Sequence, residues 1–337
     1  MAGIKALRRI QLGAETTAGT NAVATAIWRG LGMGKDNRET TFVEEDIGLL
    51  GDALRTYVAK TGGEVTLEGI ASFEQLPYIL QSSFYATTPT TDTSSAKLWS
   101  WTVQSASTDP IQTTDLQTYT VEFGDNQQAE YMNYCFTREF KLSGTVGEAL
   151  QISATMEGRT VATTDFTAGI SIPTVESILF TNGKLYIDPS TDASGTTQVS
   201  QTLFAVDLNV MTGWRGYPAA DGRTDFSFVK RTKEEITCSI TFEHNSSAVA
   251  EKAAWRNQTE RNIRLKFTGN ALSSTDVGAT YDTKALVIDM LGKWESFDAL
   301  TDQDGNDQVT GLFSCGYSAA AATKGDFTIV NELATLP

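Results

Sequence analysis

The chain has 337 residues and a formal net charge of −15, which is long enough for one large domain or two ordinary ones. The net charge is evenly distributed, at −8 over residues 1–170 and −7 over residues 171–337. This argues against a nucleic-acid-binding surface, which would contain clustered Lys and Arg. Three cysteines without CxxC spacing argue against a disulfide framework or a zinc site. Residues 1–12 lack the apolar core of a signal peptide and no apolar run could span a membrane, so we expect synthesis in the cytosol.

Alternating apolar and polar side chains predict strands with one buried and one solvated face. For example, Thr118, Thr120 and Glu122 are expected to face solvent. This pattern is typical of antiparallel sheets. The segments, in chain order, are residues 99–103, 118–123, 136–142, 204–210, 263–267 and 286–290.

Two amphipathic helices interrupt the strands. Ser72, with Gln75 three residues later, forms a capping-box pattern, so the first helix is expected to begin at Ser72. The second is expected to begin at Asn245 or Ser246. Its predicted buried face consists of the small residues Val249, Ala250, Ala253 and Ala254.

Three local echoes indicate a duplication. Residues 64–84 and 235–258 both contain a strand, a polar turn and a helix, with helix starts 173 residues apart. Trp28-Arg29-Gly30 and Trp214-Arg215-Gly216 are 186 apart, and the predicted hairpin turns Gly147-Glu148 and Gly325-Asp326 are 178 apart. We therefore predict two β domains, residues 1–170 and 171–337, with a junction near residues 163–173.

The loops are also informative. Residues 34–63 and 216–233 form long segments with weak alternation, and loops of this length are usually functional or disordered. Segments 87–96 and 189–197 are rich in Thr, Ser and Asp, as expected for loop tips. Asp304-Gly305 is a hairpin-turn signal.

No catalytic set stands out. The only histidine, His244, has no nucleophile-elbow motif to serve. Residues 302–307 lack the glycine position and the final glutamate of a calcium loop, and residues 30–35 lack the ending of a phosphate-binding loop. Cys238 is expected to be a core residue. We predict neither an enzyme nor a cofactor, although a carboxylate pair for glycoside hydrolysis stays open.

An ordered series of short segments resembles the tail tube (major tail) proteins of long-tailed, siphovirus-type bacteriophages. The series covers roughly the first two thirds of the chain. Its members are residues 15–25 (ETTAGTNAVAT), 44–50 (EEDIGLL), 72–78 (SFEQLPY), 119–128 (YTVEFGDNQQ), 134–136 (YCF), 139–144 (EFKLSG), 147–149 (GEA), 179–188 (LFTNGKLYID) and 211–213 (MTG).

The resemblance implies a structural virion protein. Such subunits form stacked rings around a tape measure protein, and genomic DNA later passes through the hollow tube into the host. The implied fold is mainly β, with two tandem tail-tube-like antiparallel β-sandwich or barrel domains, each with one flanking helix and a long inter-ring loop. The implied place is the virion tail, after synthesis in the bacterial cytoplasm. The implied partners are further copies of the chain, the tape measure protein, and the tail terminator and tail-tip proteins, with no membrane.

Family rings have six tube domains, so two domains per chain predict a ring of three chains with pseudo-sixfold symmetry. The alternative is a true hexamer in which one domain decorates the outside. An acidic lumen would repel the phosphates of passing DNA. The candidate inter-ring contacts in the two long loops are Glu44, Glu45, Asp46, Ile47, Leu49, Leu50, Arg55, Tyr57, Tyr217 and Arg223.

Two other functions remain open from the sequence. One is a carbohydrate-binding or hydrolytic β-sandwich such as a phage adhesin, which would be monomeric and bind sugars. The other is a capsid decoration protein, which would bind heads rather than polymerise.

Overall fold

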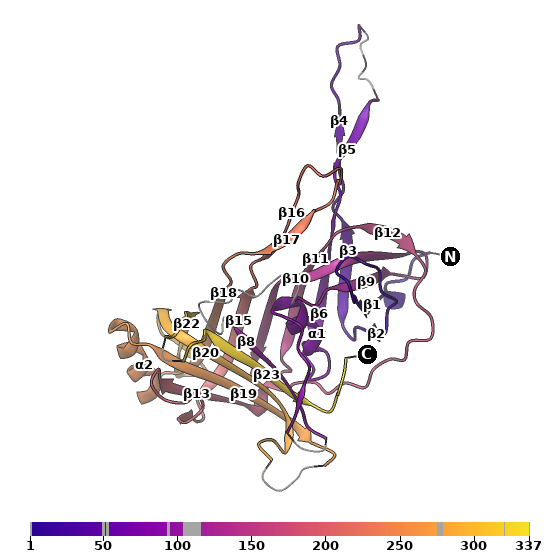
Figure 1. Cartoon of the computed structure of the whole chain (residues 1–337). Coiled ribbons are helices and arrows are strands. Elements are labelled where there is room, and N and C mark those ends of the chain that lie inside the picture. The colour runs from indigo at the N-terminus through magenta and orange to yellow at the C-terminus, as the bar shows by residue number, and fades with distance from the viewer. Residues whose placement is uncertain are drawn as a thin grey trace.

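The computed structural model describes residues 2–48, 51, 54–92, 95–103, 116–274, 279–319 and 321–336. These residues form a mainly β protein with antiparallel sheets and two α-helices, as the alternation predicts (Figure 1). Two short 3₁₀ helices, Lys5–Leu7 and Phe180–Asn182, complete the helical structure of the described residues. Neither α-helix in this part of the chain is long and apolar enough to cross a membrane.

An eight-stranded central sheet runs through the whole molecule. It passes from the first half of the chain to the second where β10 pairs with β15. The strand order is β3 (Leu31–Asp36), β6 (Gly63–Ile70), β11 (Gln151–Gly158), β10 (Ala129–Thr145), β15 (Leu203–Met211), β18 (Glu235–Glu243), β22 (Asn306–Cys315) and β20 (Thr283–Phe297). β21 (Thr301–Gln303) forms a hairpin with β22.

Two long strands, β10 and β20, leave the central sheet at their N-terminal parts and enter two further sheets. A register shift between Thr137 and Glu139 in β10, and another between Trp294 and Ser296 in β20, marks each change of direction. The sheet around β10 adds β9 (Tyr119–Gly124), β12 (Val161–Thr164), β1 (Arg9–Ala14) and β2 (Ala26–Ile27). The sheet around β20 adds β19 (Arg261–Ala271), β13 (Gly183–Pro189), β14 (Gln198–Val199), β23 (Gly325–Asn331), β8 (Lys97–Val103) and β7 (Thr90–Thr91).

The core lies between these sheets. One hydrophobic cluster contains residues from both halves of the chain, from Ile10 to Ile329. The described strands do not close into a barrel. The predicted domain junction near residues 163–173 therefore does not coincide with a break in the core, and the division into two sandwich or barrel domains stays a prediction.

The same eight strand pairings nevertheless occur once in each half. Val65 of β6 pairs with Gly34 and Met156, and Cys238 of β18, 173 residues later, pairs with Leu208 and Phe313. In the first half the pairings are β1–β2, β1–β9, β9–β10, β10–β12, β10–β11, β11–β6, β6–β3 and β4–β5. Their counterparts are β13–β14, β13–β19, β19–β20, β20–β23, β20–β22, β22–β18, β18–β15 and β16–β17.

Two of the three pairs of similar sequence segments do not lie at equivalent positions in the two halves. Trp28 precedes β3, whereas Trp214 begins β16 (Trp214–Tyr217), whose counterpart is β4. Gly325 begins strand β23 and is not in a turn. The counterpart of the Gly147 turn is instead the predicted Asp304-Gly305 turn between β21 and β22, where both residues have positive φ (54° and 85°).

The first helix, α1 (Leu76–Ser83), begins four residues after the predicted start. The Ser72 hydroxyl accepts the Gln75 N–H at 3.3 Å, as in half of a capping box. The Gln75 side chain does not return this bond, because it donates to the Ile27 carbonyl (3.0 Å) and accepts from the Arg29 N–H (3.3 Å). A tertiary contact has therefore replaced the local cap.

The second helix, α2 (Ser246–Arg256), begins as predicted, because the Asn245 side chain accepts the N–H groups of Ser247 and Ala248 at 2.9 and 3.2 Å. Its predicted buried face is wrong apart from Ala254. The buried residues are Ala248, Glu251 and Ala254, while Val249, Ala250 and Ala253 are exposed. Glu251 turns the helix this way because its carboxylate accepts from Trp294 Nε1 (2.8 Å) and pairs with Arg261 (3.0 Å).

One predicted solvated face is also wrong. Thr118, which precedes β9, and Thr120 and Glu122 within it are all buried, so this strand is covered on both sides. Polar partners satisfy them: the Glu15 carboxylate accepts from both threonine hydroxyls, and Glu122 accepts from Thr167. Alternation holds for the central sheet, where Val206, Leu208 and Val210 are buried and Asn209 is exposed.

Candidate assembly surfaces

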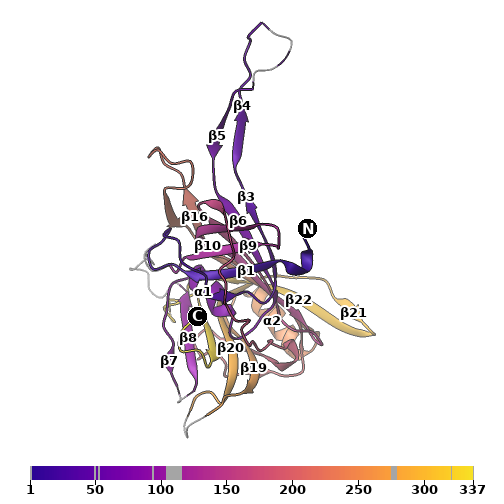
Figure 2. The same ribbon diagram turned by 90° about the vertical axis from the view of Figure 1, so that its right-hand side faces the viewer.

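Two hairpin arms project from one end of the central sheet. β4 (Glu39–Phe42) and β5 (Thr56–Lys60) continue β3 and β6 far beyond the body, as Figures 1 and 2 show, and we call residues 39–60 the first arm. β16 (Trp214–Tyr217) and β17 (Phe228–Arg231) form the second arm, residues 214–231, which is shorter and lies on the same side. The predicted long loops are therefore paired strands.

The first arm has large apolar side chains in solvent. Every residue of β4 and β5 is exposed, including Phe42 (71%) and Tyr57 (56%). Nearer the tip, Leu54 is 93% and Ile47 49% exposed. A two-stranded hairpin alone is marginal in water, and neighbouring exposed apolar side chains are a common feature of interaction surfaces.

The structure brings two of the first-arm candidates into contact. Glu45 and Arg55 form an ion pair of 2.7 Å across the arm, while Glu44 and Asp46 point into solvent beside Ile47. Tyr57 lies opposite Thr41 in β4. Leu49 and Leu50 lie outside the described residues.

The two second-arm candidates contact their own arm. Tyr217 stacks on Phe228 with ring centroids 5.7 Å apart, and Arg223 donates two hydrogen bonds to Asp225 at 2.7 and 3.1 Å. The bonded Asp225 raises the pKa of the Arg223 guanidinium. Both contacts lie within the second arm, and the Asp225 carboxylate offsets the charge of Arg223.

The loop at the end of the second arm contacts the base of the first arm. The Thr61 N–H donates to the Thr224 carbonyl at 2.9 Å, and the two threonine hydroxyls are also 2.9 Å apart. Trp214 anchors the second arm to α1, because its indole N–H donates to the Ser83 carbonyl at 2.9 Å. The arms are therefore held in a fixed relation to each other and to the body.

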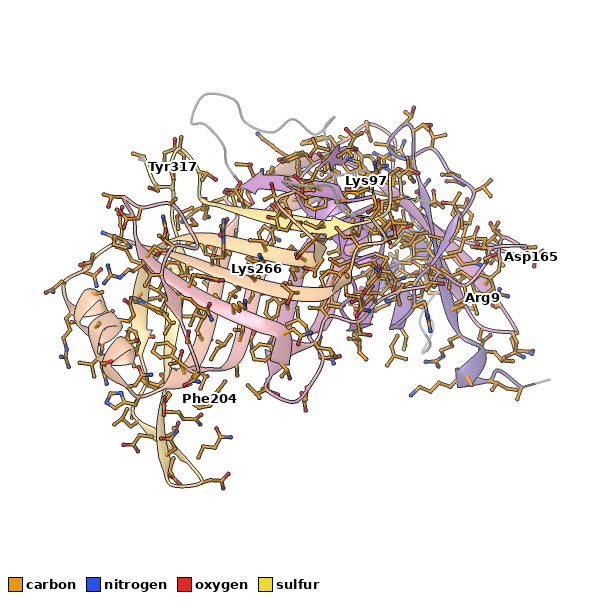
Figure 3. The ribbon with its side chains drawn as sticks, turned by 90° about the horizontal axis from the view of Figure 1, so that it is seen from below. Arg9, Lys97, Asp165, Phe204, Lys266 and Tyr317 are labelled. Atoms are coloured by element: carbon orange, nitrogen blue, oxygen red, sulfur yellow. The ribbon has the colours of Figure 1, made fainter. Side chains whose placement is uncertain are left out.

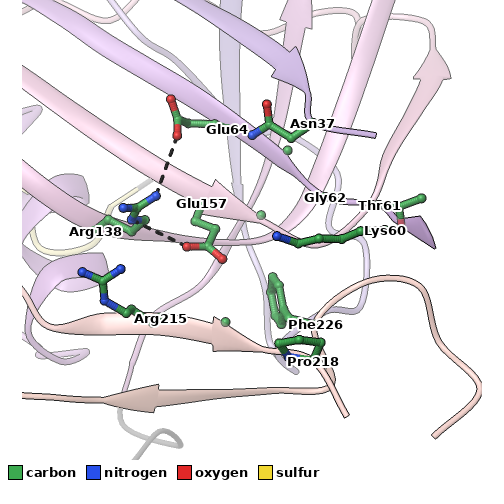
Figure 4. Close-up of a pocket in the computed structure, with 13 residues that line it drawn as sticks. Asn37, Lys60, Thr61, Gly62, Glu64, Arg138, Glu157, Arg215, Pro218 and Phe226 are labelled. Atoms are coloured by element: carbon green, nitrogen blue, oxygen red, sulfur yellow. Dashed lines mark ion pairs between the residues drawn. The ribbon is translucent and has the colours of Figure 1, made fainter. Parts of the chain in front are cut away.

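A polar cavity of about 270 Å³ lies beneath this junction (Figure 4). Arg138 spans it between the carboxylates of Glu64 (3.8 Å) and Glu157 (3.6 Å), and Lys60 and Arg215 also line it. Burial raises the pKa of Glu157, although Arg138 opposes the rise. The sequence did not predict this cavity, because its residues come from five strands, β5, β6, β10, β11 and β16, and become neighbours only in the folded protein.

The solvent-facing side of the central sheet is polar and acidic. Small side chains such as Ser153, Thr155, Ser239 and Thr241 occupy its middle. Seven carboxylates lie on this face: Glu64, Glu68, Glu139, Glu157, Asp207, Glu235 and Glu243. Four cations oppose them: Lys35, Arg138, Lys141 and Lys293.

Nothing in the described part of the chain resembles a metal centre, since no group of three His, Cys, Asp or Glu side chains is placed to hold an ion. Cys135 and Cys238 are buried, and burial raises the pKa of both thiols well above its usual range. Cys238 is therefore a core residue, as predicted.

Comparison with known proteins adds no identity. No protein-family model matches the chain, and no curated protein matches it. The functional conclusion therefore rests on the resemblance of the ordered segments and on the geometry described above.

Proposed function

We propose that this chain is the tail tube protein of a siphovirus-type phage. It assembles into rings that stack into a hollow tube around the tape measure protein, and the tube then conducts DNA into the host. The observation that carries this proposal is the side-by-side joining of two equivalent strand sets in one continuous sheet, with an open edge at each end.

The junction between the sets supports two tandem tube domains, residues 1–170 and 171–337. β10 and β15 pair through seven registered positions, from Glu139 opposite Met211 to Thr145 opposite Ala205. Each domain contributes four strands to the central sheet. A head-to-tail contact that repeats this junction between chains generates a ring when its rotation closes. Three chains then supply six tube domains, whereas in the alternative hexamer each of six chains supplies one tube domain and its other domain decorates the outside.

The acidic face of the central sheet supports the passage of DNA. If this face lines the lumen, its excess of carboxylates repels phosphates, and its serine and threonine side chains offer little for bases to bind. DNA would then slide through without adhering.

The two arms support contact between stacked rings. The first arm is long enough to leave the body and carries apolar side chains that have no cover in one chain. The described candidates for the contact are Glu44, Glu45, Asp46, Ile47, Arg55 and Tyr57 on the first arm and Tyr217 and Arg223 on the second arm. The tail terminator and tail-tip proteins would meet the same surfaces at the two ends of the tube.

Electron microscopy of the purified protein tests the function directly. Long hollow tubes of uniform diameter are expected at high protein concentration. Persistent monomers that bind glycans in a screen would contradict the proposal and favour the adhesin, and binding to phage heads would favour a decoration protein.

Removing the first arm tests its role separately. Lys35 and Asp36 belong to β3, so the deletion must spare them and replace only residues 40–58 by a short Gly-containing turn. Because β4 and β5 bury no residue, the melting temperature should be unchanged while tube elongation is lost. Tubes of normal length in negative stain would contradict the role of the arm.

A further inference from the structure

The central sheet has an open edge at each end, and the proposed ring does not by itself fix which residues pair there. β3 pairs on one side only, with β6. At the opposite end, the last part of β20 and β21 pair on one side only, with β22. Both statements concern the described residues. An unpaired edge offers free N–H and C=O groups to another strand.

The β10–β15 junction provides a template for covering these edges. β10 and β20 have the same register shift, between Thr137 and Glu139 and between Trp294 and Ser296. Aligning the two shifts gives an offset of 157 residues, so Lys141 is equivalent to Asp298. Gly34 and Leu208 pair with the equivalent residues Val65 and Cys238, so Lys35 is equivalent to Asn209.

We propose that β3 of one chain pairs antiparallel with the β20–β21 edge of a second copy, in the register of the β10–β15 junction. Because Lys141 lies opposite Asn209 in that junction, Asp298 of one copy then lies opposite Lys35 of the next. This inference rests on the proposed ring assembly and specifies its seam.

Charge complementarity supports this register. Across the intramolecular junction, Lys141 pairs with Asp207 at 2.6 Å on the solvent-facing side. The transferred register places an aspartate and a lysine directly opposite each other, the favourable arrangement for cross-strand charges. Within the described chain, neither Lys35 nor Asp298 makes an ion pair of 4 Å or less.

Apolar exposure at both edges supports it independently. Leu31 (67%) and Met33 (60%) stand on β3, and Leu300 (44%) stands at the other edge just beyond Asp298. The transferred register brings Leu300 next to Met33. Both edges would therefore lose apolar surface on pairing with each other.

The two helices differ in the same way: one face of α1 is buried by other parts of the chain, whereas the equivalent face of α2 is exposed. When their N-caps Gln75 and Asn245 are aligned, the buried residues Ile79, Leu80 and Ser83 of α1 correspond to the exposed Val249, Ala250 and Ala253 of α2.

Elements of the second half cover α1. The rings of Phe327 and Phe84, the C-cap of the helix, have centroids 5.2 Å apart, and the Trp214 indole N–H donates to the Ser83 carbonyl. α2 lies at the end of the molecule opposite Arg9 and Asp165 (Figure 3), where a second copy would cover it in the same way.

Disulfide trapping tests the register in the full-length chain. The double variant Lys35→Cys/Asp298→Cys should link neighbouring chains under mild oxidation, because directly opposite strand residues lie at about the Cα separation that a disulfide requires. The matched control, Leu31→Cys/Asp298→Cys, is four residues out of register, or about 13 Å along the strand, and should not link. Each single variant controls for the natural cysteines.

A charge swap provides a second readout. Lys35→Asp places two carboxylates at the seam and should abolish assembly at low salt, while Lys35→Asp/Asp298→Lys should restore it. Lys35 lies opposite Glu64 in its own chain, so both variants place two carboxylates side by side within one sheet. The melting temperatures of the two variants should therefore agree, and recovery of assembly in the double variant is due to the seam.

The outcomes separate the seam from the function. Tubes that form without the in-register link, or that link equally in the control pair, would overturn the seam and leave the tube function standing. Protein that forms neither oligomers nor tubes at any concentration would overturn both. In-register linkage together with rescue by the charge swap is the result that supports the seam.

Discussion

At the scale of single residues, a buried carboxylate organises the region around β9. Glu15 is 6% exposed and accepts four hydrogen bonds, from the Gly19 N–H and Thr118 hydroxyl at 2.7 Å and from the Thr120 hydroxyl and Tyr134 N–H at 2.9 Å. Tyr134 has a positive φ of 53°, which costs a non-glycine residue energy that this bond helps to offset. The carboxylate therefore accepts the hydrogen bonds that water would otherwise accept from the polar face of this strand.

Replacing this carboxylate should destabilise the fold. Glu15→Gln removes the charge that strengthens the four bonds and introduces two donors that have no acceptor there. We expect a loss of about 2–3 kcal/mol in the free energy of unfolding, measured by urea denaturation. Glu68→Gln, at an exposed position of the central sheet, is the matched control and should change the stability little. Equal effects of the two substitutions would contradict this account of Glu15.

A second residue gives a pH-dependent prediction. Burial raises the pKa of Asp326, and its cross-strand neighbour Asp289 adds to the rise. Because the folded state holds this proton more tightly than the unfolded state, ionisation of Asp326 costs stability as the pH rises through the folded-state pKa. Asp326→Asn should therefore be more stable than the natural chain at neutral pH.

The advantage of Asp326→Asn should shrink as the pH falls below the raised pKa, where the natural carboxyl is also neutral. Urea denaturation of both proteins at neutral and mildly acidic pH measures the difference. Asp165→Asn, at an exposed position, controls for general charge effects. A difference that does not depend on pH would contradict the role assigned to burial.

At the scale of elements, the proposed assembly buries the exposed face of α2 against the next copy. Val249→Arg should leave the stability of the single chain within about 0.5 kcal/mol, because the side chain is already in solvent. It should weaken assembly, since the charge would be buried against the next copy. Ala250→Ser, a small change on the same face, should assemble normally in light scattering. Normal assembly of Val249→Arg would show that this face stays uncovered in the tube.

The sequence predicts elements well where local pattern and tertiary environment agree. The six alternating segments lie in β8, β9, β10, β15, β19 and β20, although Thr118 precedes β9, and the structure also confirms the Asn245 cap and the Asp304-Gly305 turn. The central strands β3 and β11 were not among the predicted segments. The start of α1 and the face of α2 were predicted wrongly, because Gln75 and Glu251 bind partners distant in the chain. Such partners cannot be read from spacing alone.

The candidate assembly surfaces were predictable only in part. The long segments 34–63 and 216–233 pointed to both arms, but weak alternation hid their pairing as hairpins. The alternation of Leu31 and Met33 with glycines was a signal for an edge strand with exposed apolar side chains, and glycine content obscured it. The polar cavity around Arg138 gave no sequence signal.

At the scale of the whole molecule, the duplication has a different form from the one the sequence suggests. The two halves share one core and one central sheet, so they are packed together more closely than two separate domains joined by a linker. The repeated pairings still give each half the same outline, with one arm and one helix. A chain built this way already contains one domain-to-domain contact, and in the proposed ring each chain needs only one more type of contact to close.

The stoichiometry of the tube tests the central claim most directly, because the claim is that one chain supplies two neighbouring tube domains. Averaged cross-sections of the tube, together with the mass of an isolated ring, measure the number of chains per ring. Our account predicts six similar lobes with true threefold symmetry and a ring mass of three times the 36.5 kDa chain. A ring of six complete chains, or a protein that never forms rings, would contradict it.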